Sequence, residues 1–233
     1  MSSNSVAKKK KRAWSTAVFT KQLMAMSGLF FVLFLIFHAY GNLKIFLGAD
    51  AYNGYAEWLK TDAFVPIFPH GGFIIVFRVI MILLILVHIH SALVIWIRAK
   101  KGRKHGYAVK KNAVDAYAAR TMRWGGLLLI LLIVFHLLHF TTATVTTGFT
   151  SDDLPYQRMV SAFQQPWVVV IYLIFVAIAT SHVGHGFWSA FQSLGWVRKG
   201  TRKFMVYLSG IIAAIIFVMF MLPPFFIAIG VVN

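Results

Sequence analysis

Five long apolar runs separated by polar segments dominate the chain, and they extend over about residues 23–47, 73–97, 124–147, 166–190 and 204–230. A bilayer core of about 30 Å is crossed by roughly 20 residues of α-helix, so each run is long enough to span a membrane. We therefore predict an all-α membrane protein, in which residues 1–22 form a basic tail and residues 23–230 form one five-helix transmembrane domain. An odd number of crossings places the two termini on opposite sides of the bilayer.

The composition agrees with this prediction and excludes several kinds of covalent link and metal site. Hydrophobic residues make up 59% of the chain and charged residues 12%, which would leave a soluble protein with large exposed apolar patches. The chain has no cysteine, so disulfides, thiolate-bound iron–sulfur clusters and covalently attached c-type haem are excluded. The first run is too long for a signal peptide and has no clear cleavage site, so we expect it to remain as a span.

The net charge of +17 is unevenly distributed along the chain. The tail up to Lys21 and the segments 98–123 and 198–203 contain all 23 Lys and Arg residues except Lys44, Lys60, Arg78 and Arg158. By the positive-inside rule, the N-terminus is expected in the cytoplasm and the C-terminus outside. The charge then marks a cytoplasmic face, suited to anionic lipid or to a soluble partner, and nucleic acid is not expected to bind.

Histidines occur in four of the five runs: His38 in the first, His88 and His90 in the second, His136 and His139 in the third, and His182 and His185 in the fourth. Ionisable residues inside a membrane usually mark a functional site, and histidine binds metals or carries protons. At about 1.5 Å per residue from the cytoplasmic end, His38 lies roughly 22 Å deep, His136 about 18 Å, His88 about 14 Å and His182 about 12 Å. The depths predict an outer pair, His38 with His136, and an inner pair, His88 with His182.

Paired histidines at two levels favour two stacked b-type haems enclosed by the first four helices. Two axial imidazoles leave a haem iron without an open position, so such a haem transfers electrons. Depth does not select between His136 and His139 or between His182 and His185, because both members of each couple lie on one helix face. A single intramembrane histidine could equally be a packing or proton-relay residue.

Several motifs resemble the di-haem cytochrome b membrane anchor of succinate:quinone oxidoreductase (succinate dehydrogenase), of the type with a single five-span subunit. They are KQLMAMSGLF at 21–30, HAYGNLKIF at 38–46, PHG at 69–71 with Arg78 and His88, GYAV at 106–109, ARTM at 119–122, FHLLHF at 135–140 and HVGHGFWSAFQSLG at 182–195. The resemblance implies that the axial ligands of the haem irons are His38 and His136 (outer) and His88 and His182 (inner).

The resemblance also implies partners and a location. It implies a bacterial cytoplasmic membrane complex with a flavoprotein subunit that carries FAD and oxidises succinate, and an iron–sulfur subunit that passes electrons to this chain. Electrons would leave through the two haems to a membrane quinone, and the succinate site would lie on a partner chain. The basic segments 98–123 and 198–203 would then form the docking surface.

The quinone site is expected near the outer surface. Candidate contacts for a quinone or a haem propionate are Glu57, His70, Arg78, His139 and His185, although Glu57 and His70 could equally be solvated loop residues. Thr180 stands where some related fumarate reductases carry an acidic residue, which disfavours a proton route there. Alternative functions are a di-haem subunit of a fumarate reductase or of another quinone-linked oxidoreductase, such as a nitrate reductase or hydrogenase, or a haem-free transporter or scaffold.

Overall fold

The computed structural model describes residues 16–102 and 113–233, with only the backbone described over 113–120. Within these ranges the chain is helical and has no strand. The elements in order are α1 (Ala17–Leu43), a short 3₁₀ helix η2 (Lys44–Leu47), α2 (Ala49–Thr61), α3 (Gly72–Lys101), α4 (Ala113–His136), a π-helical turn η3 (Leu137–Thr141), α5 (Pro155–Phe163), α6 (Pro166–Ser193) and α7 (Arg202–Ala228).

Five helical stretches are long and apolar enough to cross a membrane: Ala17–Leu47, Gly72–Lys101, Thr121–Thr141, Pro166–Ser193 and Arg202–Ala228. Over the described residues, the prediction of an all-helical protein with five helices able to span a membrane is therefore confirmed. The third stretch ends six residues before the expected Thr147. The chain leaves the helix there through η3 and continues as an irregular segment to α5.

The centre of the bundle is formed by the first, fourth and fifth spans. α6 packs along α7, and α1 packs against both. Val32 of α1, Val183 of α6 and Ile216 of α7 meet in one apolar cluster, in which Ile216 is only 1% exposed. The fifth span, which carries no histidine, is thus part of the core.

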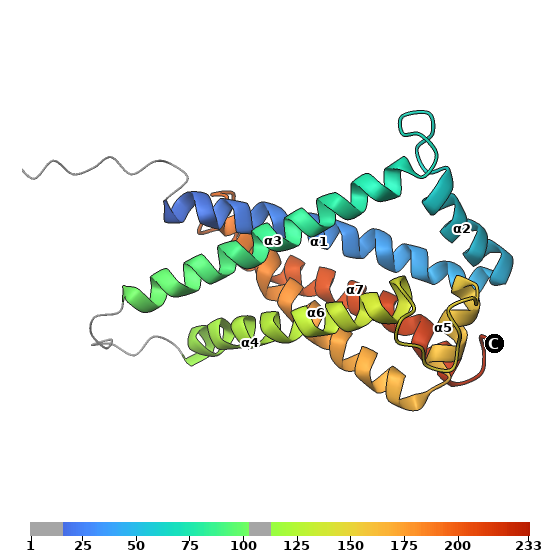
Figure 1. Ribbon diagram of the computed structural model, residues 1–233. Coiled ribbons are helices and arrows are strands. Elements are labelled where there is room, and N and C mark those ends of the chain that lie inside the picture. The colour runs from blue at the N-terminus through green and yellow to red at the C-terminus, as the bar shows by residue number, and fades with distance from the viewer. Residues whose placement is uncertain (1–15, 103–112) are drawn as a thin grey trace, which may run out of the picture.

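The second and third spans lie on the outside of this centre. α3 packs mainly against α1, and α4 packs mainly against α6 (Figure 1). All 30 residues of α3 are described, and Ser91 is the only one of them that is buried. Most of the surface of α3 is therefore free to meet lipid or another group.

One end of the bundle is closed by short elements. α2, α5 and the C-terminus lie together at that end (Figure 1), where the Tyr156 amide donates to Asn53 Oδ1 (2.9 Å) and the Tyr156 hydroxyl donates to the carbonyl of Asn233 (3.1 Å). Beneath them Phe149, Phe163, Tyr172 and Ile227 belong to a second apolar cluster. The sequence analysis did not predict α2 or α5.

The two ends of the bundle differ in charge. Asp50, Glu57, Asp62, Asp152 and Asp153 lie in α2 or in the segments at the end closed by α2 and α5. The opposite end, where α3 finishes and α7 begins, carries Arg98, Lys100, Lys101, Arg202 and Lys203. The basic residues 8–12, the loop residues 103–112 and the GYAV motif lie outside the described residues.

Candidate histidine-pair site

The first pair of histidines joins α1 to the end of α4. The ring centroids of His38 and His136 lie 5.8 Å apart, with the ring planes at 79°. Phe34 stacks on His38 at 5.2 Å, and Phe220 of α7 lies 5.6 Å from the same ring. His136, the last residue of α4, is flanked by aromatic rings in turn, those of Phe140, Tyr172 and Phe175. Aromatic side chains therefore enclose this pair.

The second pair joins α3 to α6. The ring centroids of His88 and His182 lie 6.3 Å apart, with the planes at 60°. Ser27 of α1 places its hydroxyl oxygen 3.0 Å from His88 Nδ1, and Phe31 approaches the His88 ring edge-on at 5.6 Å. The structure thus brings His38 to His136 and His88 to His182, which are among the couples that depth allowed and are the ones that the resemblance implies.

Two glycines leave room beside the second pair. A Cβ at Gly28 of α1 would lie 3.4 Å from His88 Cε1, and a Cβ at Gly126 of α4 would lie 3.7 Å from His182 Cε1. A methyl group at either position would therefore lie in van der Waals contact with an imidazole ring. The small residues Ser27, Gly28 and Gly126 let the backbones of α1 and α4 come close to these rings.

The spacing of both pairs suits a metal held between two imidazoles. With metal–nitrogen bonds of about 2.0–2.1 Å and a ring radius of about 1 Å, two imidazoles on opposite sides of one metal have centroids about 6 Å apart. The observed separations are 5.8 and 6.3 Å. Over the described residues, no three His, Cys, Asp or Glu side chains gather as a metal-holding group. Two protein ligands per site fit a haem iron, whose other four ligands come from the porphyrin, better than a tetrahedral zinc ion.

Unpartnered polar atoms accompany the second pair. Among the described residues, the buried side-chain atoms without a hydrogen-bond partner are His182 Nδ1 and Ser91 Oγ, and Ser91 lies one turn beyond His88 on α3. Buried polar atoms in folded proteins are almost always hydrogen-bonded. Their presence here is consistent with a site that a further group completes, and a haem is such a group.

His139 has a different environment from His136. It is 0% exposed, its Nδ1 lies 2.9 Å from the Tyr172 hydroxyl, and its Nε2 lies 2.6 Å from Thr147 Oγ1. Both ring nitrogens are therefore occupied by hydrogen bonds, and neither is left for a metal. The choice between His136 and His139, which depth left open, favours His136 on this geometry.

The remaining intramembrane histidines are His185 and His90. His185 is partly buried, meets the edge of Trp188 at 5.7 Å and interacts electrostatically with His182. His90 is exposed on α3.

The candidates at the end of the bundle closed by α2 are exposed and lie on α2, on α3 and in the loop between them. Glu57 lies on α2, and Arg78 lies near the start of α3. His70 is 79% exposed and pairs through Nδ1 with Asp62 Oδ1 at 2.6 Å. Hydrogen bonds from the Thr61 hydroxyl and the His70 ring lower the pKa of Asp62 below its usual value. His70 is thus engaged with a neighbouring loop residue, and the structure does not place it in contact with a histidine pair.

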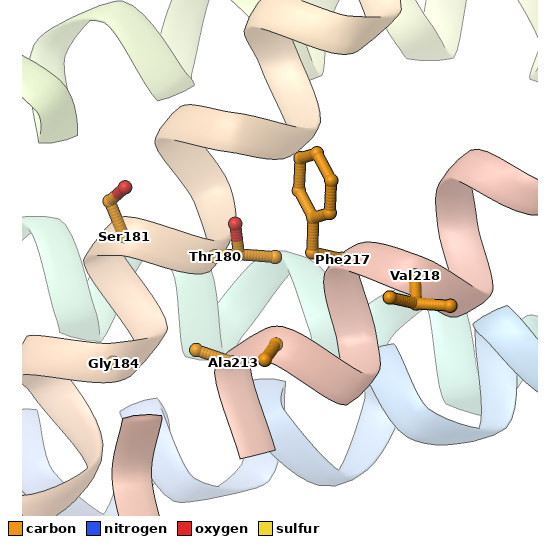
Figure 2. A pocket seen from close by; sticks show the side chains of 7 residues that line it. Thr180, Ser181, Gly184, Ala213, Phe217 and Val218 are labelled. Carbon is orange, nitrogen blue, oxygen red and sulfur yellow. The ribbon is translucent and has the colours of Figure 1, made fainter. Parts of the chain in front are cut away.

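A shallow hollow of about 400 Å³ lies between α6 and α7, lined by Thr180, Ser181, Gly184, Ala213, Ala214, Phe217 and Val218 (Figure 2). Its two hydroxyl groups donate within α6, from Thr180 to the Val176 carbonyl (2.8 Å) and from Ser181 to the Ala177 carbonyl (2.7 Å). No charged side chain lines it. The hollow therefore offers no polar group directed at a ligand, and we assign it no role.

Three polar residues that contact the histidines were missed in the sequence. Ser27 and Tyr172 lie within apolar runs. A hydroxyl group buried there needs a hydrogen-bond partner, so their position in the sequence could have marked them as neighbours of a polar side chain. Thr147 gave no comparable signal, because its contact with His139 depends on the chain leaving the helix.

Comparisons of the chain with protein-family models, with curated proteins and with solved structures gave no match.

Proposed function

We propose that this chain is the di-haem cytochrome b membrane anchor of a succinate:quinone oxidoreductase, which carries electrons from an iron–sulfur subunit to a membrane quinone. The observation that carries the proposal is the arrangement of four histidines from four spans as two pairs, with ring separations of 5.8 and 6.3 Å. His38 and His136 hold the outer haem b, and His88 and His182 hold the inner one.

Each pair has surroundings suited to this task. Haem b held by these two pairs of histidines would supply one-electron transfer. Phe34, Phe140, Phe175 and Phe220 exclude water from the outer pair. Ser27 orients the His88 ring from α1, and Gly28 and Gly126 keep the space beside the inner pair open.

The resemblance implies the partners, and the distribution of charge supports the orientation. The basic end of the bundle faces the cytoplasm, with the N-terminus on that side and the C-terminus outside, in a bacterial cytoplasmic membrane. Arg98, Lys100, Lys101, Arg123 and Arg198 contribute to the surface on which the iron–sulfur subunit docks, and the FAD-containing flavoprotein binds to that subunit. Succinate is oxidised there, and no residue of this chain contacts it.

The quinone is reduced near the outer end of the bundle. Glu57 on α2 and Arg78 on α3 lie at that end and are exposed. Reduction of a quinone requires protons as well as electrons, and a carboxylate or imidazole close to the bound quinone supplies them. Glu57 and His70 are the acid–base candidates, and Arg78 is suited to pair with a propionate carboxylate.

The first test counts haems. Membranes containing the complex are measured by reduced-minus-oxidised spectra and by pyridine haemochrome assay, for the unaltered chain and for His38→Ala, His88→Ala, His136→Ala and His182→Ala. We expect two haems b in the unaltered chain and one in each variant, with His90→Ala as an exposed-histidine control that retains two. Absence of a b-type signal, or two haems remaining in His182→Ala, would refute the assignment.

The second test identifies the partner by its electron donor. Succinate added to these membranes should reduce the haems, and hydrogen, formate or nitrate should not change their redox state. Reduction by hydrogen or formate without reduction by succinate would instead assign the chain to another quinone-linked oxidoreductase.

A further inference from the structure

The hydrogen bonds around His88 fix which of its ring nitrogens carries the proton. Ser27 is 1% exposed, and its hydroxyl lies 2.8 Å from the Leu23 carbonyl and 3.1 Å from the Met24 carbonyl of its own helix. A carbonyl only accepts, so the single hydroxyl hydrogen of Ser27 is directed to these oxygens. The 3.0 Å contact with His88 therefore has the Nδ1–H of His88 donating to Ser27 Oγ. In that tautomer His88 Nε2 carries a lone pair.

The hydroxyl of Tyr172 lies between two histidines of the third span. It is 2.9 Å from His139 Nδ1 and 3.4 Å from His136 Nδ1, and His139 Nε2 is 2.6 Å from Thr147 Oγ1. Tyr172 has one hydrogen to donate, so it can donate to only one of the two rings, and where it does so it accepts from the other. The chain of bonds thus runs either from His136 to Thr147 or in the reverse direction.

Only one of these two directions permits His136 to bind a metal through Nε2. In that direction His136 Nδ1–H donates to Tyr172, the Tyr172 hydroxyl donates to His139 Nδ1, and His139 Nε2–H donates to Thr147 Oγ1. In the reverse direction Tyr172 donates to His136 Nδ1, the ring proton moves to Nε2, and the lone pair needed for the metal is lost. Tyr172 can therefore serve His136 only as an acceptor.

We propose that Ser27 and Tyr172 are positioning residues that hold His88 and His136 as Nδ1–H tautomers, so that one imidazole of each pair presents its Nε2 lone pair to a haem iron. This inference rests on the proposed function. The two sites use different supports. At the inner pair the Met24 carbonyl also accepts from His88 beside Ser27, whereas Tyr172 at the outer pair is itself held by His139 and Thr147. His139 then orients Tyr172 and does not bind iron.

The consequence is a separate control of each haem's reduction potential. A ligand histidine that donates its second N–H to an acceptor is a more basic ligand, and such outer-shell partners typically contribute about 10–100-fold to metal affinity. A more basic imidazole stabilises ferric over ferrous iron. Removing either acceptor should therefore raise the potential of the haem it serves and leave the other haem unchanged.

The test is a crossed pair of substitutions in the intact complex, Ser27→Ala and Tyr172→Phe. Each deletes one oxygen atom from the protein. Redox titrations monitored by absorbance and by low-spin ferric electron paramagnetic resonance give both potentials, and the one-haem variants His88→Ala and His136→Ala assign each potential to the inner or outer haem. Ser209→Ala is the matched control, since Ser209 is also 1% exposed and donates to a carbonyl of its own helix, that of Val206, at 2.7 Å.

We expect Ser27→Ala to raise only the inner potential and Tyr172→Phe only the outer one. A tenfold change in the preference for ferric over ferrous iron corresponds to a rise of about 59 mV in a one-electron couple. Loss of the inner haem alone in Ser27→Ala, or of the outer haem alone in Tyr172→Phe, would support the same assignment through affinity.

Several results would overturn the inference. Unchanged potentials in both variants, with two haems that succinate still reduces, would reject it and leave the proposed function intact. Equal shifts of both haems, the loss of both haems in either variant, or a comparable shift in Ser209→Ala would indicate a general structural effect. Absence of haem from the unaltered chain would reject both proposals.

Discussion

Replacement of Gly148 by alanine should destabilise the protein more than the same replacement at other glycines. Gly148 follows Thr147 in the irregular segment after η3 and has a φ of +75°. A Cβ there would lie 2.8 Å from the carbonyl oxygen of Ser161 and 3.1 Å from Gln165 Nε2. The first contact is with the backbone of α5, so the steric overlap can be removed only if the loop or the helix moves.

The expected loss has two parts. A left-handed backbone costs a residue with a Cβ about 1–2 kcal/mol. Forcing extra atoms into a packed site typically costs about 1–3 kcal/mol more. The sum of about 2–5 kcal/mol corresponds to a fall in melting temperature of roughly 4–20 °C, because 1 kcal/mol shifts Tm by about 2–4 °C in a protein of this size.

Alanine substitutions at two other glycines distinguish the backbone cost from the steric cost when the melting temperatures of the detergent-solubilised variants are compared. Gly195 has a φ of +80° with no atom within 4 Å of its Cβ position, so Gly195→Ala should show only the backbone cost. Gly54 lies in α2 with equally open space, and Gly54→Ala should raise Tm slightly, since alanine favours a helix by about 0.5–1 kcal/mol. A fall in Tm in Gly148→Ala that is no larger than the fall in Gly195→Ala would refute the steric argument.

Further predictions concern the loop, the core and the inner pair. Because hydrogen bonds lower the pKa of Asp62, they stabilise segment 62–71 at pH values above the ordinary aspartate pKa of about 3.9, and this support is lost as pH falls through the lowered pKa. Amide hydrogen-exchange protection of the segment, corrected for the intrinsic exchange rate at each pH, should therefore fall at low pH. Asp62→Asn should show lower protection at neutral pH and a weaker dependence on pH; equal protection in the two proteins would contradict this. Ile216→Ala should lower the free energy of unfolding by about 2–5 kcal/mol in calorimetry, whereas Ile211→Ala, at a side chain 56% exposed, should have little effect; similar losses would contradict the core assignment. On the proposed function, Gly126→Leu should remove one haem in the pyridine haemochrome assay by placing its side chain against His182, and retention of both haems would contradict this.

The long spans were predictable because their apolar character depends on the bilayer and needs no tertiary contact. The short helices α2 and α5 were not predictable in this way. The sequence of α2 mixes polar residues with Gly54, and α5 has only nine residues. Each depends on the other for packing, as in the hydrogen bond from the Tyr52 hydroxyl to Met159 Sδ (3.0 Å). Such contacts join segments about a hundred residues apart, beyond the reach of a local pattern.

The end of the third span illustrates a conflict between apolar pattern and polar partners. The apolar run continues to Thr147, so the sequence predicted helix to that point. Eight residues along a straight helix correspond to about 12 Å, whereas the side chains of His139 and Thr147 meet at 2.6 Å. The chain therefore has to turn back after Thr141. A buried histidine with two nitrogens to satisfy is sufficient physical reason for it to do so.

At the candidate site, depth predicted which histidines lie together but not what each ring nitrogen contacts. Depth depends only on the rise of a helix and on the ends of the runs. The contacts of His88 and His139 depend on helix rotation and on the path of the loop after η3. The haem ligands themselves stay a prediction, supported by the resemblance and by the ring spacings.

The placement of α6 and α7 at the centre of the bundle has a consequence for the order in which the molecule assembles. Ribosomes add about 5–20 residues per second, so α7 is complete only some 10–45 s after synthesis begins. Until α6 follows, α1 lacks both of its partners at the centre of the bundle, and its main packing neighbour is α3. The partner of His38 arrives with α4, whereas the partner of His88 arrives only with α6. The outer histidine pair is therefore the first that the growing chain can complete.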